Sequence, residues 1–465
     1  MSETRPVAVI LAAGKGTRLK SHTAKVLQRA AGLPLLEHVL RAVAPLQPRA
    51  TLVVVGHQAE AVELAFAGRG LSFVRQEPQL GTGHALLVAR AALPAHGTVL
   101  VLSGDVPLLR PRTLAQLLEA HLADGADATL LTAVLDEPGA YGRVLRGADG
   151  RPQAVVEARD ATPEQRACRE INVGLYAFEA AALLRALDGL RPENAQGEYY
   201  LTDVVAALSA DGARLLGAAA DDAGEVLGVN TQAELAESAR WLRRRRVEEL
   251  MAAGVVVEDP ETTHVGADVA VEADAVLRPF TLLEGRTRVA RGAVVGPFAR
   301  LENVDVGSGA QVLDHCLLRD CCVGPGAAVG PFTHVRPETR IGARAKVGNF
   351  VELKKTDLGE GSKAPHLSYL GDATIGSGVN IGAGTITCNY DGTAKYPTRI
   401  EDGAFVGSDS TLVAPVTIGA GAYVGAGSTI TKDVPAEALA VGRARQVVKE
   451  GWARTRRARS GGPRH

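Results

Sequence analysis

Short apolar runs alternate with amphipathic segments through the first half of the chain. Residues 33–44 and 113–123 carry apolar side chains at helical spacing. The runs around them are brief, aliphatic or β-branched and bounded by turn residues, as is typical of buried strands. These runs are residues 7–11, 52–55, 98–102 and 129–134. The alternation predicts an α/β domain with a mainly parallel sheet over residues 1–230.

The second half has a different pattern, with an aliphatic residue at every sixth position. Glycine directly follows many of these residues, as in Val323-Gly324 and Ile418-Gly419. A six-residue period with glycine at the corners predicts a parallel β-helix over residues 254–448, with three strands to a coil. The two inward-facing series are Val323, Val329, Val335, Ile341, Val347 and Leu353, then Ile400, Val406, Leu412, Ile418, Val424 and Ile430.

Two stretches break the six-residue period, residues 358–370 and 389–399. We expect both to leave the solenoid as surface loops, where function tends to lie. A long helix over residues 231–253 is expected to connect the domains. It contains four consecutive arginines, Arg243 to Arg246, which cover every face of a helix, so we expect most of them to be solvated or paired.

Composition narrows the class of protein. Lys and Arg total 51 against 52 Asp and Glu, and this net charge of −1 gives no support to a broad nucleic-acid or membrane surface. The five cysteines form no CxxC pair, so neither a disulfide framework nor a zinc site is indicated. No stretch approaches the roughly 20 apolar residues of a membrane span, and we expect a cytoplasmic protein. The basic tail, residues 449–465, is expected to be at least partly disordered.

A glycine-rich segment, residues 11–18 with the sequence LAAGKGTR, follows the first predicted strand. Its backbone N–H groups can approach phosphate oxygens, and Lys15 and Arg18 add positive charge. The segment has neither the Walker GxxxxGK[ST] pattern nor the third glycine of the dinucleotide fingerprint. From these residues alone, a phosphate-binding loop and a plain tight turn both remain open.

Polar residues at three other places would complete a nucleotide site. Residues 76–85 form a glycine-rich loop with amide and hydroxyl groups suited to reading a base edge. Asp105 directly follows a buried strand, where open α/β sheets bind ligands. Asn230 ends another apolar run. It fits either an N-cap for the following helix or, together with Asp105, a pair of oxygen ligands for Mg²⁺ on nucleotide phosphates.

These motifs, in this order, resemble the sugar-nucleotide pyrophosphorylases. With the β-helix attached, residues 5–452 resemble the family that combines N-acetylglucosamine-1-phosphate uridyltransferase with glucosamine-1-phosphate N-acetyltransferase. The resemblance implies a Rossmann-like nucleotidyltransferase domain, a left-handed β-helix, a homotrimer and a role in making a peptidoglycan and lipopolysaccharide precursor. The motifs are residues 11–18 with Lys25, residues 81–85, Gly104-Asp105-Val106-Pro107, Tyr141-Gly142-Arg143, Glu157, Asn172-Val173-Gly174 and Asn230.

For the first domain, the resemblance implies attack of a sugar-1-phosphate oxygen on the α-phosphorus of UTP, with release of pyrophosphate. Mg²⁺ would be held by Asp105 and Asn230, and Arg18 and Lys25 would stabilise the triphosphate. By itself, Glu157 could equally be a solvated acid on a strand. The residues assigned to UTP or UDP-sugar are Leu11, Ala12, Ala13, Gly14, Lys25, Gln76, Gly81 and Thr82, the last three facing uracil, with Asp105 and Asn230, and Gly142, Glu157 and Asn172 on the sugar.

For the β-helix, His366 is the candidate base. A lone histidine is usually structural, but acetyl transfer to an amine needs a base, and histidine's ordinary pKa of about 6.5 suits that task. The resemblance implies that His366 serves acetyl transfer from acetyl-CoA to glucosamine-1-phosphate and that Glu352 orients its ring. It assigns the sugar phosphate to Arg336, Lys354, Tyr369, Asn380 and Lys395, and the acetyl-CoA end to Ala383, Asn389, Tyr390, Ser408, Ala426 and Arg443.

The chain departs from the family pattern at two positions, and other functions remain open. Ala24 stands where Pro precedes the lysine, and Ser103 stands where an aromatic residue precedes Gly104. One alternative is a single-activity pyrophosphorylase whose β-helix serves oligomerisation or regulation. Another is a non-catalytic assembly or sensor protein. A third keeps both activities but changes the substrates, for example to galactosamine-1-phosphate or dTTP.

Overall fold

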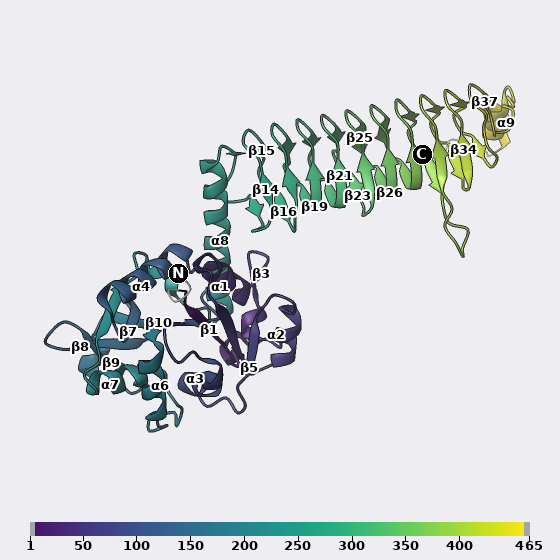
Figure 1. Ribbon diagram of the computed structural model, residues 1–465. Coiled ribbons are helices and arrows are strands. Elements are labelled where there is room, and N and C mark those ends of the chain that lie inside the picture. The colour runs from purple at the N-terminus through teal and green to yellow at the C-terminus, as the bar shows by residue number, and fades with distance from the viewer. Residues whose placement is uncertain (1–4, 460–465) are drawn as a thin grey trace. The chain divides into compact units, whose positions relative to one another are not determined.

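The computed structural model describes residues 5–459 of the chain (Figure 1). The chain divides into two compact units at residues 243/244, a boundary that lies inside helix α8 (Gln232–Ala252). In α8, Arg244 and Arg246 pair with Glu248 and Glu249, as expected of an arginine run on a helix.

The first unit is built on a nine-stranded sheet whose main path runs β11-β7-β10-β6-β1-β4-β5. All neighbours on this path are parallel except β10, which is antiparallel to both β6 and β7. The expected mainly parallel sheet is therefore confirmed. Its strands are β1 (Val7–Ala12), β4 (Ala50–Val55), β5 (Ser72–Arg75), β6 (Thr98–Ser103), β7 (Ala128–Val134), β10 (Glu170–Glu179) and β11 (Leu215–Ala219), with β8 (Gly142–Arg146) and β9 (Pro152–Val156) joined to β10.

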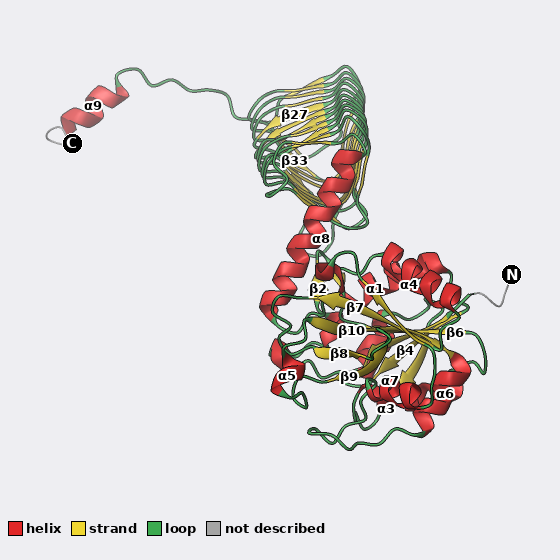
Figure 2. Ribbon diagram, turned by 90° about the vertical axis from the view of Figure 1, so that its left-hand side faces the viewer, coloured by secondary structure: helices red, strands yellow, loops and turns green. Residues whose placement is uncertain are grey.

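Helices cover both faces of this sheet (Figure 2). Alternate residues of β1 belong to different cores, Val7 and Val9 to one and Ala8 and Ile10 to the other, because successive side chains of a strand point to opposite faces. One core is closed by α3 (Thr82–Ala89), α6 (Ala180–Asp188) and α7 (Asp203–Ala210), and the other by α1 (Leu35–Val43), α2 (Ala59–Ala65) and α4 (Pro111–Asp124). A single-turn helix, α5 (Pro163–Arg166), lies outside these two layers of core.

The second unit is a parallel solenoid of short strands. Every member of the two aliphatic series is buried, with at most 5% of its surface exposed, so the six-residue period identifies the inward positions correctly. One ladder holds β12 (Val256–Val257), β15 (Val276–Leu277), β18 (Val294–Val295), β20 (Gln311–Val312), β22 (Ala328–Val329), β25 (Lys346–Asn349), β27 (Lys363–His366), β29 (Asn380–Ile381), β32 (Phe405–Val406), β35 (Tyr423–Val424) and β37 (Leu439–Ala440).

The remaining solenoid strands form a second sheet. It holds β13 (His264–Val265), β14 (Ala270–Val271), β16 (Leu282–Glu284), β17 (Arg288–Val289), β19 (Arg300–Val306), β21 (Leu317–Val323), β23 (His334–Val335), β24 (Thr339–Ile341), β26 (Glu352–Leu358), β28 (Tyr369–Ile375), β30 (Ile386–Cys388), β31 (Thr398–Ile400), β33 (Thr411–Val413), β34 (Val416–Ile418) and β36 (Thr429–Ile430).

The first break in the period is not a loop. Leu358, Ala364 and Leu370 are all buried, and β27 pairs in parallel between β25 and β29. Successive inward positions lie five residues apart, not six, from Leu353 to Leu358. The prediction that residues 358–370 leave the solenoid is therefore wrong. His366 ends strand β27 instead.

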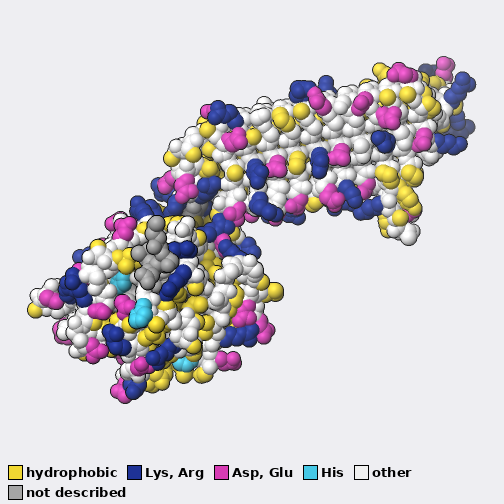
Figure 3. Space-filling view, in the orientation of Figure 1, with side chains coloured by type: hydrophobic (Ala, Val, Ile, Leu, Met, Phe, Trp, Pro, Cys, Tyr) yellow, Lys and Arg dark blue, Asp and Glu magenta, His cyan; other side chains and the backbone are white. Residues whose placement is uncertain are grey.

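The second break does leave the solenoid, as an arm that projects from it in Figure 1. Tyr390 and Lys395 pair across the arm in an antiparallel bridge, and the chain returns to the core at Thr398 and Ile400. Beyond the solenoid, Trp452–Arg459 forms helix α9, so this part of the tail, which was expected to be at least partly disordered, is helical. Residues 460–465 lie outside the described residues. On the face visible in Figure 3, basic and acidic side chains are interspersed, in keeping with the near-neutral charge.

Candidate active sites

Two loops of the first unit emerge side by side at one edge of its sheet. Leu11 and Ser103 are register partners at the ends of β1 and β6, and the Gly104 N–H donates to the Leu11 carbonyl at 2.9 Å. A Cβ on Gly104 would lie 3.1 Å from that carbonyl oxygen, so a side chain there would crowd the strand. This contact places the glycine loop next to the segment that carries Asp105, at the carboxyl edge where such sheets bind ligands.

The charged residues predicted for the nucleotide site meet at this edge. Lys25 forms an ion pair with Asp105, and both side chains are about one-seventh exposed. Lys25 Nζ also donates to Asn230 Oδ1 at 2.8 Å, and Arg18 Nη2 donates to the same oxygen at 2.8 Å. Residues from four separate parts of the chain therefore converge on one small, partly buried volume.

Asn230 is not the N-cap that the sequence left open. Thr231 and Glu234 form the reciprocal cap of α8, since the Glu234 N–H donates to Thr231 Oγ1 and the Thr231 N–H donates to the Glu234 carboxylate. The Val229 N–H donates to the Asp105 carbonyl at 2.9 Å. The Asn230 oxygen is thereby left to face the cations.

Both departures from the family pattern make contacts that the family residue would not. Ser103 Oγ donates to Asp105 Oδ1 at 2.6 Å, a bond that an aromatic ring cannot provide. The Ala24 N–H donates to Gln58 Oε1 at 2.8 Å, and proline has no N–H to donate. Ser103 thus holds the carboxylate of Asp105, and Gln58 holds the segment before Lys25.

A buried acid connects the two loops that carry Asp105 and Asn230. Glu225 is 1% exposed, its Oε2 lies 2.9 Å from Arg110 Nε, and its Oε1 accepts from the Thr113 hydroxyl. Arg110 follows Asp105 closely in the chain, and Glu225 precedes Asn230 closely. The sequence analysis missed this pair because its members are far apart along the chain and no local motif marks either of them.

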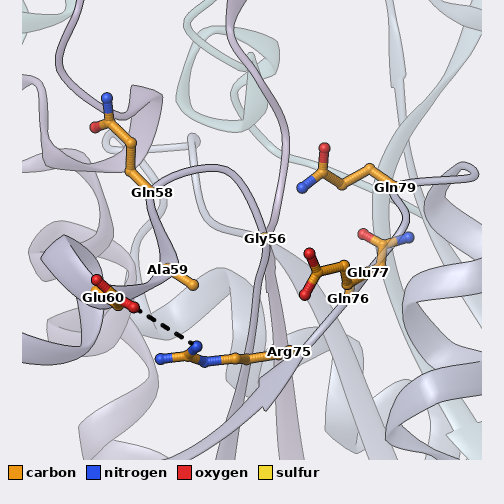
Figure 4. A pocket seen from close by; sticks show the side chains of 8 residues that line it. All are labelled: Gly56, Gln58, Ala59, Glu60, Arg75, Gln76, Glu77 and Gln79. Carbon is orange, nitrogen blue, oxygen red and sulfur yellow. Dashed lines mark ion pairs between the residues drawn. The ribbon is translucent and has the colours of Figure 1, made fainter.

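A polar pocket of about 220 Å³ opens beside the glycine loop (Figure 4). A Cβ on Gly56 would lie 3.0 Å from Ala13 and 2.7 Å from Gln79 Nε2, so this pocket adjoins the loop directly. Gln79, which the sequence analysis did not assign, therefore also lies close to the loop. The lining residues are Gly56, Gln58, Ala59, Glu60, Arg75, Gln76, Glu77 and Gln79.

Of the three residues expected to face uracil, one lines this pocket. Gln76 is 3% exposed and its Nε2 donates to the Gly81 carbonyl at 2.8 Å, so its amide group also holds its own loop. Gly81 packs the other way, since a Cβ there would lie 2.5 Å from the Tyr199 carbonyl. Thr82 Oγ1 accepts from the Leu201 N–H at 3.1 Å. Gly81 and Thr82 thus hold the segment around Tyr199 against the loop of residues 76–85.

The three residues predicted for the sugar lie next to one another: Gly142 on β8, Asn172 on β10, and Glu157 directly after the end of β9. Asn172 is the register partner of Gly142, and a Cβ on Gly142 would lie 3.6 Å from the Glu157 carboxylate. Asn172 Nδ2 donates to the Tyr176 hydroxyl at 2.7 Å. Small size at Gly142 leaves the space between the two polar side chains open.

Glu157 is not a solvated acid on a strand. Burial raises the pKa of its carboxyl group above the ordinary value, and the negative charges of Asp160 and Asp203 act in the same direction. The hydroxyl of Thr202 donates to Oε1 at 3.3 Å and opposes this rise in pKa. A half-buried carboxyl group of this kind is suited to accept hydrogen bonds from a ligand.

In the second unit, the exposed ring of His366 is oriented by Asn349. His366 Nδ1 lies 3.0 Å from Asn349 Oδ1, and these residues are register partners in β27 and β25. An amide oxygen accepts, so Nδ1 is the donor in this contact, and in the neutral ring the lone pair is then on Nε2. Glu352 pairs instead with Arg336 at 2.9 Å, and the prediction that Glu352 orients the histidine is wrong.

Cations from the solenoid and the arm gather around a pocket of about 320 Å³. Contact with the Lys354 ammonium and its charge lower the pKa of Lys395, which lies on the arm. An anion bound between these side chains would relieve their repulsion, so the pocket suits a phosphate group. The lining residues are Arg336, Pro337, Glu338, Lys354, Lys355, Asp372 and Lys395.

Two further predicted residues border this pocket, and two lie apart from it. Tyr369 and Asn389 both lie over Gly371, where a Cβ would collide with each of them, and Asn389 Nδ2 donates to the Asp372 carboxylate. Tyr390 is on the exposed arm, where its hydroxyl donates to the arm's own backbone. Asn380 begins β29.

The residues predicted for acetyl-CoA follow one another along successive coils. The Asp409 N–H donates to the Ala383 carbonyl and the Gly427 N–H to the Ser408 carbonyl, both at 2.7 Å. A Cβ on Gly407 would lie 2.5 Å from the Ala426 N, and one on Gly427 would lie 3.7 Å from Arg443. We call Ala383, Ser408, Ala426 and Arg443 the small-residue column. Three of the four have small side chains, and Arg443 is the exception.

Comparison with known proteins identifies the family. A family profile described as MobA-like NTP transferase domain matches residues 8–255, and one described as bacterial transferase hexapeptide (six repeats) matches residues 397–432. The Bifunctional protein GlmU of Koribacter versatilis (strain Ellin345) is 48% identical over 463 residues, which cover 98% of this chain and 99% of that protein. This chain belongs to the GlmU family.

Other GlmU relatives are equally similar over their full length. The Bifunctional protein GlmU of Pelotomaculum thermopropionicum is 52% identical over 457 residues, 97% of this chain and 98% of that protein. The GlmU-family chain is thus a bifunctional enzyme that joins an NTP transferase domain to a left-handed β-helix of hexapeptide repeats, and the fold class expected from its sequence is confirmed. Among residues 5–459, no helix is long and apolar enough to cross a membrane.

Proposed function

We propose that the β-helix acetylates glucosamine-1-phosphate with acetyl-CoA and that the first unit then transfers UMP from UTP to the product. The final products are UDP-N-acetylglucosamine and pyrophosphate. The observation that carries this proposal is the convergence of Lys25 and Arg18 on Asp105 and Asn230 beside the glycine loop. An oriented histidine in the second unit supports the acetyl-transfer half. We place the protein in the cytoplasm, where UTP and acetyl-CoA are made and used, as a homotrimer.

Asp105 and Asn230 fit a Mg²⁺ ion. They offer one carboxylate and one amide oxygen, the kind of donor that Mg²⁺ takes from a protein when substrate phosphates and water complete its shell. Both oxygens already hold a cation, because the Lys25 ammonium contacts each of them. When bound, the ion would neutralise charge on the nucleotide phosphates.

In the first unit, the protein's own residues mainly position the reactants and neutralise charge. A phosphate oxygen of the sugar-1-phosphate is already nucleophilic, so no protein base is needed to activate it. Lys25 and Arg18 stabilise the triphosphate and the departing pyrophosphate. Gln76 and Gln79 lie where they can meet the base, while Gly142, Glu157 and Asn172 hold the sugar.

In the second unit, His366 takes a proton from the sugar amine. The amine needs a free lone pair to attack the thioester carbon, and Nε2 of His366 is the ring nitrogen that can accept the proton. Arg336, Lys354 and Lys395 hold the phosphate of the sugar, which fixes the amine relative to the ring. The small-residue column accommodates acetyl-CoA along the coils. Coenzyme A leaves as the free thiol, taking up a proton that replaces the one removed from the amine.

A coupled assay of the purified full chain tests both halves together. The mixture contains glucosamine-1-phosphate, acetyl-CoA, UTP and Mg²⁺, and free thiol and pyrophosphate are followed separately. We expect both to be released, with pyrophosphate release depending on acetyl-CoA. Thiol without pyrophosphate would refute the assignment of UTP, and replacement by dTTP would then be measured. Pyrophosphate without thiol would refute the acetyl-transfer half.

The raised pKa of Glu157 predicts a pH dependence of sugar binding. An ionised carboxylate accepts hydrogen bonds from sugar hydroxyls on both oxygens and more strongly than a protonated carboxyl group does. A raised pKa means that the ionised form is lost at a higher pH than for an ordinary glutamate. We expect the KM for N-acetylglucosamine-1-phosphate in uridyl transfer to rise as pH falls through that raised pKa, while kcat changes less. The substrate's own phosphate also titrates in this region.

The Glu157→Gln variant separates the two titrations. Glutamine keeps the shape but has no titrating group, so the variant should have a raised KM at neutral pH and keep only the part of the pH dependence that belongs to the phosphate. Identical KM-against-pH curves for the two proteins would remove Glu157 from the sugar site.

A further inference from the structure

The Lys25 ammonium lies between the two oxygens that we assign to Mg²⁺. Its nitrogen forms an ion pair with Oδ2 of Asp105 and lies 2.8 Å from Oδ1 of Asn230. Arg18 adds a second positive charge at 2.8 Å from the same Asn230 oxygen. The position between the ligands is thus filled by the protein's own cations.

The other polar atoms of both ligands are held by the protein. Ser103 donates to Asp105 Oδ1 at 2.6 Å, and Asn230 Nδ2 donates to the Gly228 carbonyl at 3.3 Å. Each side chain is therefore anchored on one atom, and the free oxygen of each points at Lys25. The oxygens cannot turn elsewhere to meet a metal ion without breaking these bonds.

An ammonium and a magnesium ion compete for these two oxygens. Mg²⁺ requires oxygen ligands at about 2.0–2.1 Å, which would bring it within roughly 4 Å of an ammonium that kept both contacts. Like charges at that separation repel strongly in a partly buried site. Lys25 therefore opposes entry of the metal ion for as long as it keeps both contacts.

We propose that Lys25 acts as an internal counter-ion that closes the metal site until nucleotide binds. This rests on the proposed nucleotidyl transfer. The triphosphate offers Lys25 and Arg18 stronger partners, and their withdrawal frees Asp105 and Asn230 for the metal ion. Because coupling between two ligands is reciprocal, the metal ion also raises the affinity for nucleotide, by holding Lys25 away from Asp105.

The glycine loop packs on the stem of this lysine. Gly16 has φ +61°, and a Cβ there would lie 2.8 Å from Lys25 Cβ and 3.4 Å from its Cγ. A phosphate held by the loop's backbone therefore arrives next to the very side chain that must move. Binding of phosphate to the glycine loop would therefore act directly on the position of Lys25.

Direct binding of Mn²⁺, followed by the loss of its free-ion electron paramagnetic resonance signal, tests the proposal without any turnover. The proteins are the full chain, the Lys25→Met variant and the Lys15→Met variant, all without nucleotide. Lys15→Met is the matched control, since it removes the same charge from the neighbouring glycine loop, residues 11–18. Lys25→Met should bind Mn²⁺ about 5- to 150-fold more tightly than the unmodified chain, the usual range for coupled sites, and Lys15→Met should change little.

Equal Mn²⁺ affinity in Lys25→Met and the unmodified chain would overturn the proposal, and so would an equal gain in Lys15→Met, which would point to a general charge effect. The circular dichroism spectrum and the thermal unfolding of each variant, compared with those of the unmodified chain, verify that the first unit is folded. Adding Asp105→Asn to Lys25→Met should abolish the tighter binding. Tight binding that survives this change would place the metal ion elsewhere and would count against the metal site of the proposed function itself.

Discussion

Replacing His366 with alanine should lower acetyl transfer by about 10²- to 10⁴-fold, the usual contribution of a general base, and leave uridyl transfer unchanged. The reason is geometric: Asn349 fixes the tautomer, so Nε2 is the nitrogen that accepts the proton from the amine. Thiol release from acetyl-CoA with glucosamine-1-phosphate measures the first activity. Pyrophosphate release from UTP with pre-acetylated sugar phosphate measures the second on the same preparation.

Two further measurements separate a base from a structural histidine. Added imidazole should restore part of the acetyl transfer lost in His366→Ala, since it can supply the missing lone pair. Asn349→Ala should cost less, about tenfold, because the ring remains but its tautomer and orientation are no longer fixed. A parallel fall of both activities in His366→Ala would instead show a folding defect and contradict the assignment.

Replacing Asp105 with asparagine should have the opposite selectivity. The carboxylate is the only negative charge among the four side chains that converge at the sheet edge, so its loss leaves the metal ion without its charged ligand. We expect uridyl transfer to fall by about 10²- to 10³-fold, as for loss of one electrostatic group in an active site, with acetyl transfer intact. Initial rates at several Mg²⁺ concentrations provide the measurement.

Asp136→Asn is the matched control for this change. Asp136 belongs to the same unit, is 90% exposed and pairs with Arg169 at the surface, so the same chemical change there should leave uridyl transfer within about twofold. High Mg²⁺ should recover part of the activity of Asp105→Asn, because asparagine keeps an oxygen ligand. Full activity of Asp105→Asn at low Mg²⁺ would remove Asp105 from the metal site.

The solenoid could be predicted well because its sequence signal is local and repeated. One aliphatic residue per short strand is enough to fix the inward positions, and all twelve predicted positions from Val323 to Ile430 are buried. The same signal failed at residues 358–370, because the stretch is bounded by two five-residue steps, from Leu353 to Leu358 and from Leu370 to Ile375, which shift the six-residue series. A one-residue shortening changes the period as visibly as a loop does, and the pattern of apolar residues does not separate the two.

Long-range pairs marked the limit of what the sequence could predict. The meeting of Lys25 with Asp105 and Asn230 followed from motifs of a family, whereas the Arg110–Glu225 pair and the Asn349–His366 contact had no motif to announce them. Glu352 was a reasonable choice to orient the histidine because carboxylates commonly do so. Which residue lies beside His366 depends on the coil register, and that register includes the five-residue step that we misread.

The number of coils in the solenoid also fixes the distance between the residues it carries. His366 precedes the small-residue column by one coil, since Ser368 Oγ lies 2.8 Å from the His366 carbonyl and 3.4 Å from the Gly382 carbonyl. From His366 to Arg443 the chain advances by four coils. At the strand spacing of about 4.8 Å, these two residues lie roughly 19 Å apart along the solenoid axis. A whole coil gained or lost before His366 would leave the distance from His366 to Arg443 unchanged. A coil gained between these two residues would move Arg443 away from a ligand of fixed length. On the proposed assignment of acetyl-CoA to this column, the number of repeats between these two residues would be constrained by the length of that ligand.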